Sequence, residues 1–286
     1  MDSEAAFYKI KVRYIALLII VGMILFFMFI GAICPSLGGP EKAVIAGLFF
    51  YALIALWITL NFNKYDVNYK KFVGTIPYDI NWLEVIAVVF AIIILSLGFT
   101  ELRIYILSTI NPDILSYVPG SSTFYSLKDS PMAPFLNFME FIIGVLIAPI
   151  VEEFLFRGVM LHRFTVKWGI RTAVLVSSFI FGILHADILG AFLFGVVMCI
   201  LYIRTGTIIV PIICHMLNNL IAYGTQMLGT FAPKVSKAGT VTHIPNLELA
   251  IFLMIFSGVI IGYYIYRNWP RKYWVSPYFR KYDEEY

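Results

Sequence analysis

Long apolar runs separated by short polar segments are the main pattern along this chain. A run of about 20 apolar residues can cross the hydrocarbon core of a bilayer as an α-helix. Pro and Gly between the runs are typical helix breakers. We therefore expect an all-α fold, a polytopic membrane helical bundle of about eight transmembrane helices, with 104–118 along the membrane interface. The expected helices lie at 12–33, 42–61, 83–100, 135–161, 171–186, 188–203, 207–224 and 247–267.

The first apolar run follows three basic residues, as a signal peptide does: Lys9, Lys11 and Arg13. Its stretch from Ile15 to Ile33 exceeds the roughly 7–15 apolar residues of a signal-peptide core. That stretch is also long enough to span the membrane. We expect an uncleaved first helix.

The composition excludes a soluble domain. The chain has 286 residues, of which 60% are hydrophobic and 13% are charged. The net charge of +4 comes from basic residues spread over short loops, so it does not indicate nucleic-acid binding. Three cysteines, an odd number in or beside apolar runs, favour packing over a disulfide framework. The simplest domain count is one membrane domain, 1–286.

An even number of spans places both termini on one side of the membrane, and the basic residues indicate which side. Under the predicted topology, 16 of the 21 Lys and Arg residues fall on the side of the termini. Basic residues concentrate on the cytoplasmic side of membrane proteins. We expect a multi-pass membrane protein with cytoplasmic N- and C-termini, in the cell membrane of a prokaryote or the endoplasmic reticulum of a eukaryote.

Three charged residues interrupt the apolar helix expected at 135–161: Glu152, Glu153 and Arg157. A charge at this depth costs at least a few kcal/mol, so an ionisable residue there indicates a function by default. Around the helix axis, Arg157 lies about 40° from Glu153 and about 140° from Glu152. Glu153 and Arg157 therefore form a favourable i,i+4 pair. This pairing leaves Glu152 free for chemistry.

Further polar side chains lie in the apolar helices that follow. His185 comes four residues after Phe181, so the two share a helix face. His215 precedes Asn219 by four residues and shares a face with it. Because polar groups at membrane depth face the bundle interior and not the lipid, we expect these residues to meet Glu152 in one site.

This inventory of side chains suits the hydrolysis of a peptide bond by an activated water. A buried glutamate can act as general base, and a neutral imidazole can orient the water. A histidine and an asparagine amide can donate hydrogen bonds to a tetrahedral oxyanion. Two histidines and a glutamate equally resemble a zinc site with an open position. The residues alone leave metal-bound and metal-free water open.

Other intramembrane protease chemistries lack their motifs in this sequence. It contains no His-Glu-x-x-His, no Gly-x-Gly-Asp and no Gly-x-Ser-x-Gly. Ser177 and Ser178 have no evident base partner. A site-2-type zinc protease, a presenilin-type aspartyl protease and a serine protease are therefore disfavoured.

Three motifs in order on successive helices resemble the CPBP family. These are the CAAX-protease and bacteriocin-processing (Abi) membrane endopeptidases, which include the type II CAAX prenyl endopeptidases. The similarity covers about 135–224, which would form the catalytic core. The motifs are Glu-Glu-x-x-x-Arg at Glu152, Glu153 and Arg157, Phe-x-x-x-His at Phe181 and His185, and His-x-x-x-Asn at His215 and Asn219.

The resemblance implies an eight-helix bundle with a conical cavity open to the cytosol and to lipid. It implies that Glu152 and His185 activate water and that His215 and Asn219 stabilise the oxyanion. Glu153, Arg157 and Phe181 would support them. We favour a mechanism without a metal or other cofactor. A zinc ion, in the alternative mechanism, would be held by Glu152, His185 and His215.

The expected function is that of an intramembrane endopeptidase. Its substrate would be the C-terminal region of a prenylated CAAX protein or a bacteriocin-type leader peptide, met in contact with membrane lipid. The alternative is a non-catalytic scaffold or immunity protein that holds a membrane partner protein. Replacing Glu152 by Gln separates the two, because Gln cannot act as a base. A transporter is disfavoured, because the chain shows no inverted repeats.

The depths expected for His185 and Glu152 differ, which conflicts with a shared site. Counting about 1.5 Å per residue, His185 lies ~21 Å from a helix start at Arg171. By the same count, Glu152 lies only ~15 Å from a helix end at His162. A shared site requires tilted helices or different helix boundaries. His162 itself is expected at the cytosolic interface, and Asp187 is expected to cap a helix end.

Overall fold

The computed structural model describes residues 3–110, 124–231 and 246–280, and within these ranges every regular element is a helix. Six helices are long and apolar enough to cross a membrane. The all-α, multi-pass bundle predicted from the sequence is thereby confirmed. The six are α2 (Arg13–Ile33), α3 (Gly39–Lys64), α5 (Trp82–Ile110), the continuous helix Ala133–Trp168, α11 (Ile188–Thr205) and α13 (Leu247–Asn268).

Two of the eight predicted spans fall outside this group, for different reasons. α10 (Ile170–Ile183) has 14 residues. It is therefore about 21 Å long, too short to cross the bilayer core by itself. α12 (Ile209–Phe231) has 23 residues, but His215, Asn218 and Asn219 interrupt its apolar character. The count of eight spans therefore remains a prediction.

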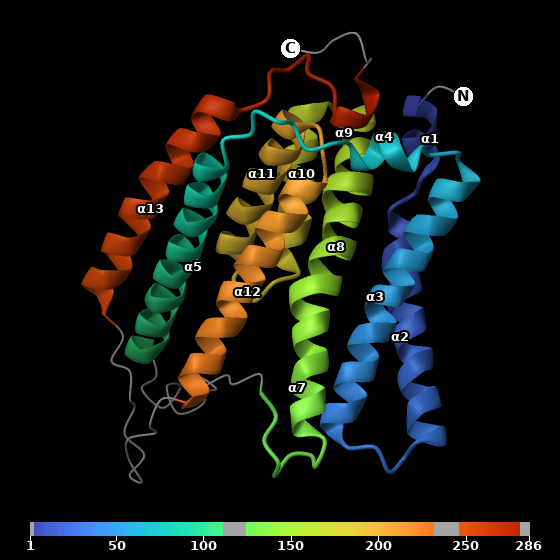
Figure 1. The fold of residues 1–286 in the computed structure, drawn as a ribbon, viewed down its shortest axis with the longest axis vertical. Coiled ribbons are helices and arrows are strands. Elements are labelled where there is room, and N and C mark those ends of the chain that lie inside the picture. Colours follow the sequence, from blue (N-terminus) through green and yellow to red (C-terminus); the bar gives the residue numbers. More distant parts are fainter. Residues whose placement is uncertain (1–2, 111–123, 232–245, 281–286) are drawn as a thin grey trace.

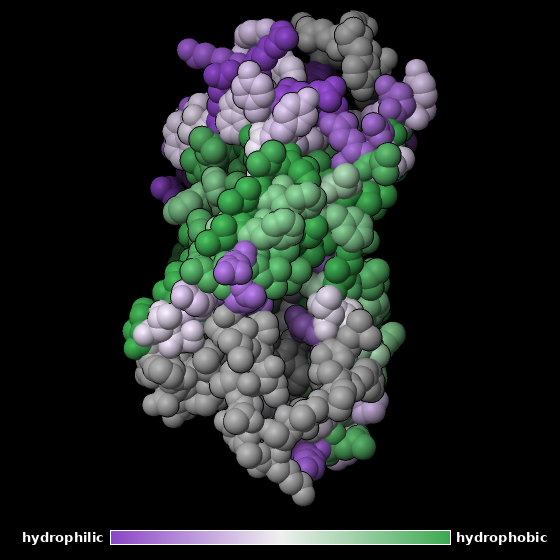
Figure 2. All heavy atoms as spheres, turned by 90° about the vertical axis from the view of Figure 1, so that its left-hand side faces the viewer, coloured by the Kyte–Doolittle hydropathy of each residue, from purple (hydrophilic) through white to green (hydrophobic). Residues whose placement is uncertain are grey.

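The helices stand side by side in one bundle, with α13 against α5 at one edge and α2 against α3 at the other (Figure 1). Between them lie α10, α11, α12 and the long helix Ala133–Trp168. The short helices α1 (Ser3–Lys9), α4 (Tyr69–Val73) and η3 (Pro277–Phe279) gather at one end. A side view shows an apolar band across the middle and hydrophilic residues at that same end (Figure 2). This distribution suits a bundle embedded in a bilayer.

The long helix Ala133–Trp168 changes its winding along its length. Pro149 has no N–H, and in a regular α-helix its ring would clash with the carbonyl of Val145. The wider π turn just before Pro149 accommodates the ring, and π segments are frequent at functional sites. The Glu-Glu pair lies in the short α segment between two π segments. In order, the segments are α7 (Ala133–Phe141), π-helical η1 (Ile142–Ile147), α8 (Ala148–Glu153), π-helical η2 (Phe154–Met160) and α9 (Leu161–Trp168).

α10 and α11 form a helical hairpin whose turn contains His185. Gly169 joins α9 to α10 with a φ of +81°, which favours glycine. α10 ends at Ile183, so His185 lies beyond the helix and the predicted end at 186 is wrong. The predicted cap is confirmed, because Asp187 accepts a hydrogen bond from the N–H of Gly190 at 3.0 Å and starts α11. This cap ends the hairpin turn two residues after His185.

The conflict in depth disappears with the observed boundaries. The long helix continues to Trp168, so Glu152 lies 168 − 152 = 16 residues from its end, or ~24 Å. His185 lies 185 − 170 = 15 residues from the start of α10 at Ile170, or ~22 Å. The two side chains therefore come to the same level of the bundle.

The predicted end of the helix at about residue 100 is also wrong. α5 continues through Glu101 and Arg103 to Ile110. Arg103 therefore lies inside the helix, and its guanidinium donates to the carbonyl oxygen of Ala186 at 3.5 Å. The predicted interfacial segment 104–118 is thus helical to Ile110, and its remainder lies outside the described residues.

His162 is fully buried within the protein, and its predicted place at the cytosolic interface stays a prediction. Its ring stacks on Phe7 of α1 with centroids 4.8 Å apart, and it makes an edge contact with Tyr278 of η3 at 6.0 Å. Its Nε2 accepts a hydrogen bond from the N–H of Tyr278 at 3.3 Å. The two terminal segments fold over α9 and exclude solvent from this histidine, which sequence periodicity could not indicate.

Candidate active site

Three predicted site residues meet at one carboxylate oxygen. Oε2 of Glu152 in α8 lies 3.9 Å from Nε2 of His185 and 3.8 Å from Nε2 of His215. The side chains come from α8, from the α10–α11 turn and from α12, as the burial of polar groups predicts. Gaps of 3.8 and 3.9 Å are too long for direct hydrogen bonds between these atoms.

The second nitrogen of each imidazole is fixed by a partner. Nδ1 of His185 lies 2.7 Å from the carbonyl oxygen of Phe181, and Nδ1 of His215 lies 2.8 Å from Oε1 of Glu153. Both partners are acceptors, so each Nδ1 carries the proton and donates it. In a neutral imidazole, Nε2 then presents a lone pair toward Glu152. The Phe181 and Glu153 contacts thus orient both rings.

Glu153 and Arg157 form the buried ion pair that the helix spacing predicts. Nη1 of Arg157 donates to Oε1 of Glu153 at 2.8 Å, and both side chains are almost fully buried. The guanidinium carbon of Arg157 lies 4.5 Å from the ring centroid of Phe181, which adds a cation–π contact. Glu153 therefore bridges the structural arginine and His215.

Asn219 is held by two contacts. Its Nδ2 donates to the carbonyl oxygen of Gly144 in η1 at 2.8 Å, and its Oδ1 accepts from Nδ2 of Asn218 at 3.1 Å. The amide of Asn219 has a second N–H, and no described residue accepts a hydrogen bond from it. The sequence did not indicate a role for Asn218, because an asparagine adjacent to a motif has no distinguishing signal.

Tyr51 is a further residue of the site that the sequence did not indicate. Its hydroxyl donates to Oε1 of Glu152 at 2.9 Å from α3, 101 residues away along the chain. A tyrosine in an apolar helix is ordinary, so no local pattern marks it.

The site opens at two of its side chains. The side chains of Glu152 and His185 are 15% and 36% exposed, whereas those of Glu153, Arg157 and His215 are at most 4% exposed. A Cβ added to Gly144 would meet no atom within 4 Å, so free space also borders this glycine. The reacting carboxylate is thus partly accessible, while the groups that hold it are buried.

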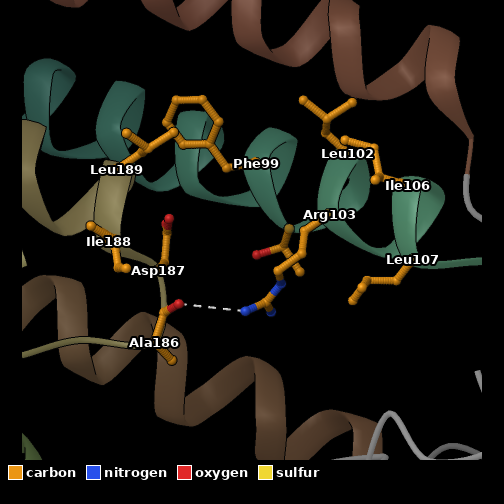
Figure 3. A pocket seen from close by; sticks show the side chains of 10 residues that line it. Phe99, Leu102, Arg103, Ile106, Leu107, Ala186, Asp187, Ile188 and Leu189 are labelled. Atoms are coloured by element: carbon orange, nitrogen blue, oxygen red, sulfur yellow. Dashed lines mark hydrogen bonds between the residues drawn. The ribbon is translucent and has the colours of Figure 1, made fainter. Parts of the chain in front are cut away.

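A cavity of about 350 Å³ lies on the other side of the hairpin turn, between it and α5 (Figure 3). Phe99, Ile106 and Leu189 contribute to its apolar lining, and Arg103 reaches across it to Ala186. None of the predicted site residues lines it. The cavity is therefore separate from the reacting groups, and the Arg103 contact supports the turn that follows His185.

Two imidazoles and a carboxylate are donor types that bind zinc, and their spacing is slightly wider than in a tetrahedral zinc site. Two ligands of one tetrahedral zinc ion lie roughly 3.4 Å apart, whereas the two Nε2 atoms lie 3.8 and 3.9 Å from Oε2 of Glu152. In the part of the chain that the structure describes, no group of three or more His, Cys, Asp or Glu is placed to hold a metal ion. The mechanism proposed below has no metal step, and the removal of metal tests it.

Known proteins are similar to this chain in the segment that contains the site. Residues 134–221 match the family model described as type II CAAX prenyl endopeptidase Rce1-like. The Bacillus subtilis (strain 168) protein "Putative membrane peptidase YdiL" is 38% identical over 81 residues, 27% of this chain and 33% of that protein. The Staphylococcus aureus (strain USA300) protein "Membrane-embedded CAAX protease MroQ" is 36% identical over 110 residues, 35% of this chain and 44% of that protein. No solved structure gives a significant match to the chain.

These matches cover the site and leave out much of the bundle. The alignments span less than half the length of either curated relative. The family match includes Glu152, His185, His215 and Asn219, and excludes α2, α3, α5 and α13. The resemblance inferred from the three motifs is thereby confirmed over residues 134–221, which match the model described as type II CAAX prenyl endopeptidase Rce1-like.

Proposed function

We propose that this protein is an intramembrane endopeptidase that hydrolyses a peptide bond with a water activated by Glu152 and His185. The observation that supports this most is the convergence of two Nε2 atoms on Oε2 of Glu152, at 3.8 and 3.9 Å. Both rings present a lone pair to this point when they are neutral. A water bound there can donate hydrogen bonds to Glu152 and to an imidazole at the same time.

In the first step, the water oxygen attacks the carbonyl carbon of the scissile bond. Glu152 takes one proton from the water as the new C–O bond forms, and Nε2 of His185 accepts a hydrogen bond that orients the same water. The product is a tetrahedral intermediate with a negative oxygen.

That oxygen requires hydrogen-bond donors. The second N–H of Asn219 is one donor, since its first is used by Gly144. His215 can supply another from Nε2 when it is protonated, because Nδ1 already donates to Glu153. Fixed donors of this kind are the usual means of stabilising an oxyanion.

In the last step, the intermediate collapses and the C–N bond breaks. Glu152 returns its proton to the leaving amine nitrogen, so the same carboxyl group acts first as base and then as acid. The products are a peptide with a new carboxyl end and a peptide with a new amino end.

The substrate class follows from the comparisons and the membrane setting. A match to an Rce1-like model and a relative named a CAAX protease favour the C-terminal region of a prenylated protein. A bacteriocin-type leader peptide is the second substrate class, and lipid is the surrounding partner. We propose cytoplasmic termini, because the basic residues are concentrated on that side.

The test is cleavage of a fluorogenic farnesylated CAAX peptide by purified protein. Glu152→Gln should lower the rate at least 10²-fold, since it removes the base. Glu140→Gln is the matched control, because Glu140 lies on the same long helix and contacts Tyr125 outside the site. Activity retained in Glu152→Gln, or no cleavage of either substrate class by wild type, would contradict the proposal.

Removal of metal is a separate prediction. A strong chelator should leave the cleavage rate of the wild-type protein unchanged, because the proposed mechanism has no metal step. The measurement is the rate before and after chelation, with zinc added back. A rate that falls on chelation and returns with zinc would assign Glu152, His185 and His215 to metal binding instead.

A further inference from the structure

Glu152 has two oxygens, and the structure gives them different surroundings. Oε2 faces the two imidazoles, while Oε1 accepts a hydrogen bond from the Tyr51 hydroxyl at 2.9 Å. Tyr51 lies on α3, outside the segment 134–221 that matches the family. The catalytic carboxylate is therefore bound by a helix that the family match does not include.

We propose that Tyr51 is a positioning residue that holds the Glu152 carboxylate in the orientation required for water activation. The inference rests on the proposed function, because it concerns the same reacting oxygen. By occupying Oε1, the hydroxyl leaves Oε2 directed at His185 and His215. Tyr51 itself does not touch the substrate in this mechanism.

The neighbouring carboxylate shows why Glu152 needs this contact. Glu153 is fixed by Arg157 and by His215, both at 2.8 Å. Among the described residues, Tyr51 donates the one hydrogen bond within 3.5 Å that reaches Glu152. The terminal torsion of a glutamate is broad, so without a partner the plane of its carboxylate can turn away from the two imidazoles. The hydroxyl of Tyr51 removes that freedom.

Packing in turn holds the ring of Tyr51. It contacts the main hydrophobic core and also a smaller cluster formed by Val44, Leu136 and Ile143. The residues of the smaller cluster come from α3, α7 and η1. A side chain held in this way can fix a reacting group to within a few tenths of an ångström, as catalysis requires.

The test is Tyr51→Phe, which removes the hydroxyl and keeps the ring. Loss of a hydrogen bond to a charged group should lower kcat on the order of 10- to 100-fold, with little change in KM. In a Glu152→Gln background the same change should have almost no further effect, because the base is already absent. A thermal unfolding midpoint close to that of the wild type would show that the bundle is intact.

Tyr125→Phe is the matched control. Tyr125 also donates to a glutamate, Oε1 of Glu140, at 3.4 Å, but this glutamate lies outside the site. Its replacement should leave kcat unchanged. Equal kcat in Tyr51→Phe and wild type would overturn the inference while leaving the endopeptidase intact. A wild-type protein that cleaves neither substrate class would instead refute the proposed function, and the inference with it.

Discussion

At the scale of single residues, the buried charges of the site depend on one another. Glu153 accepts from Arg157 and from His215 through the same oxygen, Oε1. Its other oxygen and two nitrogens of Arg157 are buried without a hydrogen-bond partner in the described structure. A buried charge that loses its partner destabilises a protein strongly, whereas replacing both partners is often tolerated.

Arg157→Met should therefore reduce the free energy of unfolding by about 3–5 kcal/mol, because it leaves the buried Glu153 carboxylate without its cationic partner. The double variant Glu153→Met, Arg157→Met should regain much of this stability. Cleavage should stay low in the double variant, since Nδ1 of His215 has lost its acceptor. Unfolding in detergent and the cleavage assay measure the two effects, and a single variant as stable as the double one would contradict the pairing.

The sequence could predict the charged residues but not their second partners. Glu152, Glu153 and Arg157 stand out because charges are rare in apolar helices. Tyr51 does not stand out, because the chain has 18 tyrosines and most need no special explanation. A hydrogen bond between helices far apart in the sequence leaves no local pattern.

At the scale of helices, the sequence predicted where the apolar runs lie but not how they wind. The period of apolar residues does not distinguish an α turn from a π turn over six or seven residues. The continuation of α5 past Arg103 was missed for a related reason. Arginine is a good helix former, so a charge does not by itself end a helix, and Arg103 has a partner in the carbonyl of Ala186.

The close packing of α4 against η2 gives a prediction about stability. A Cβ added to Gly158 would lie 2.2 Å from the Phe72 ring, which is itself fully buried. Gly158→Ala should therefore destabilise the protein by about 1–3 kcal/mol through overpacking. Thermal unfolding of the purified variant measures this loss.

Two further variants make the test specific. Phe72→Leu should restore part of the stability of Gly158→Ala, because the shorter side chain makes room for the methyl group. Gly144→Ala should leave stability almost unchanged, since no atom lies within 4 Å of its added Cβ. An equal loss in both alanine variants would show that helix geometry, and not the Phe72 contact, determines the effect.

At the scale of the whole molecule, α1, α4 and η3 gather at one end, and the turn between α2 and α3 lies at the other (Figure 1). If the termini are cytoplasmic, that turn faces outward. Cys34 caps α2 there and is partly exposed, whereas Cys199 and Cys214 are buried.

A membrane-impermeant thiol reagent should therefore label Cys34 in intact cells. Mass spectrometry of the labelled chain measures the site, and Cys34→Ser should abolish the label. Labelling of Cys34 in inverted vesicles but not in intact cells would reverse the proposed orientation.

The aromatic contacts around His162 have a consequence for biosynthesis. Phe7 leaves the ribosome before Tyr278, which is separated from it by 278 − 7 = 271 residues of translation. Both rings contact His162, so this cluster cannot be complete while the helices between them are still being inserted. During that interval the rings of Phe7 and His162 are not yet covered by Tyr278. Exposed apolar surface of this kind is what insertion partners and quality-control proteases recognise on a nascent membrane chain.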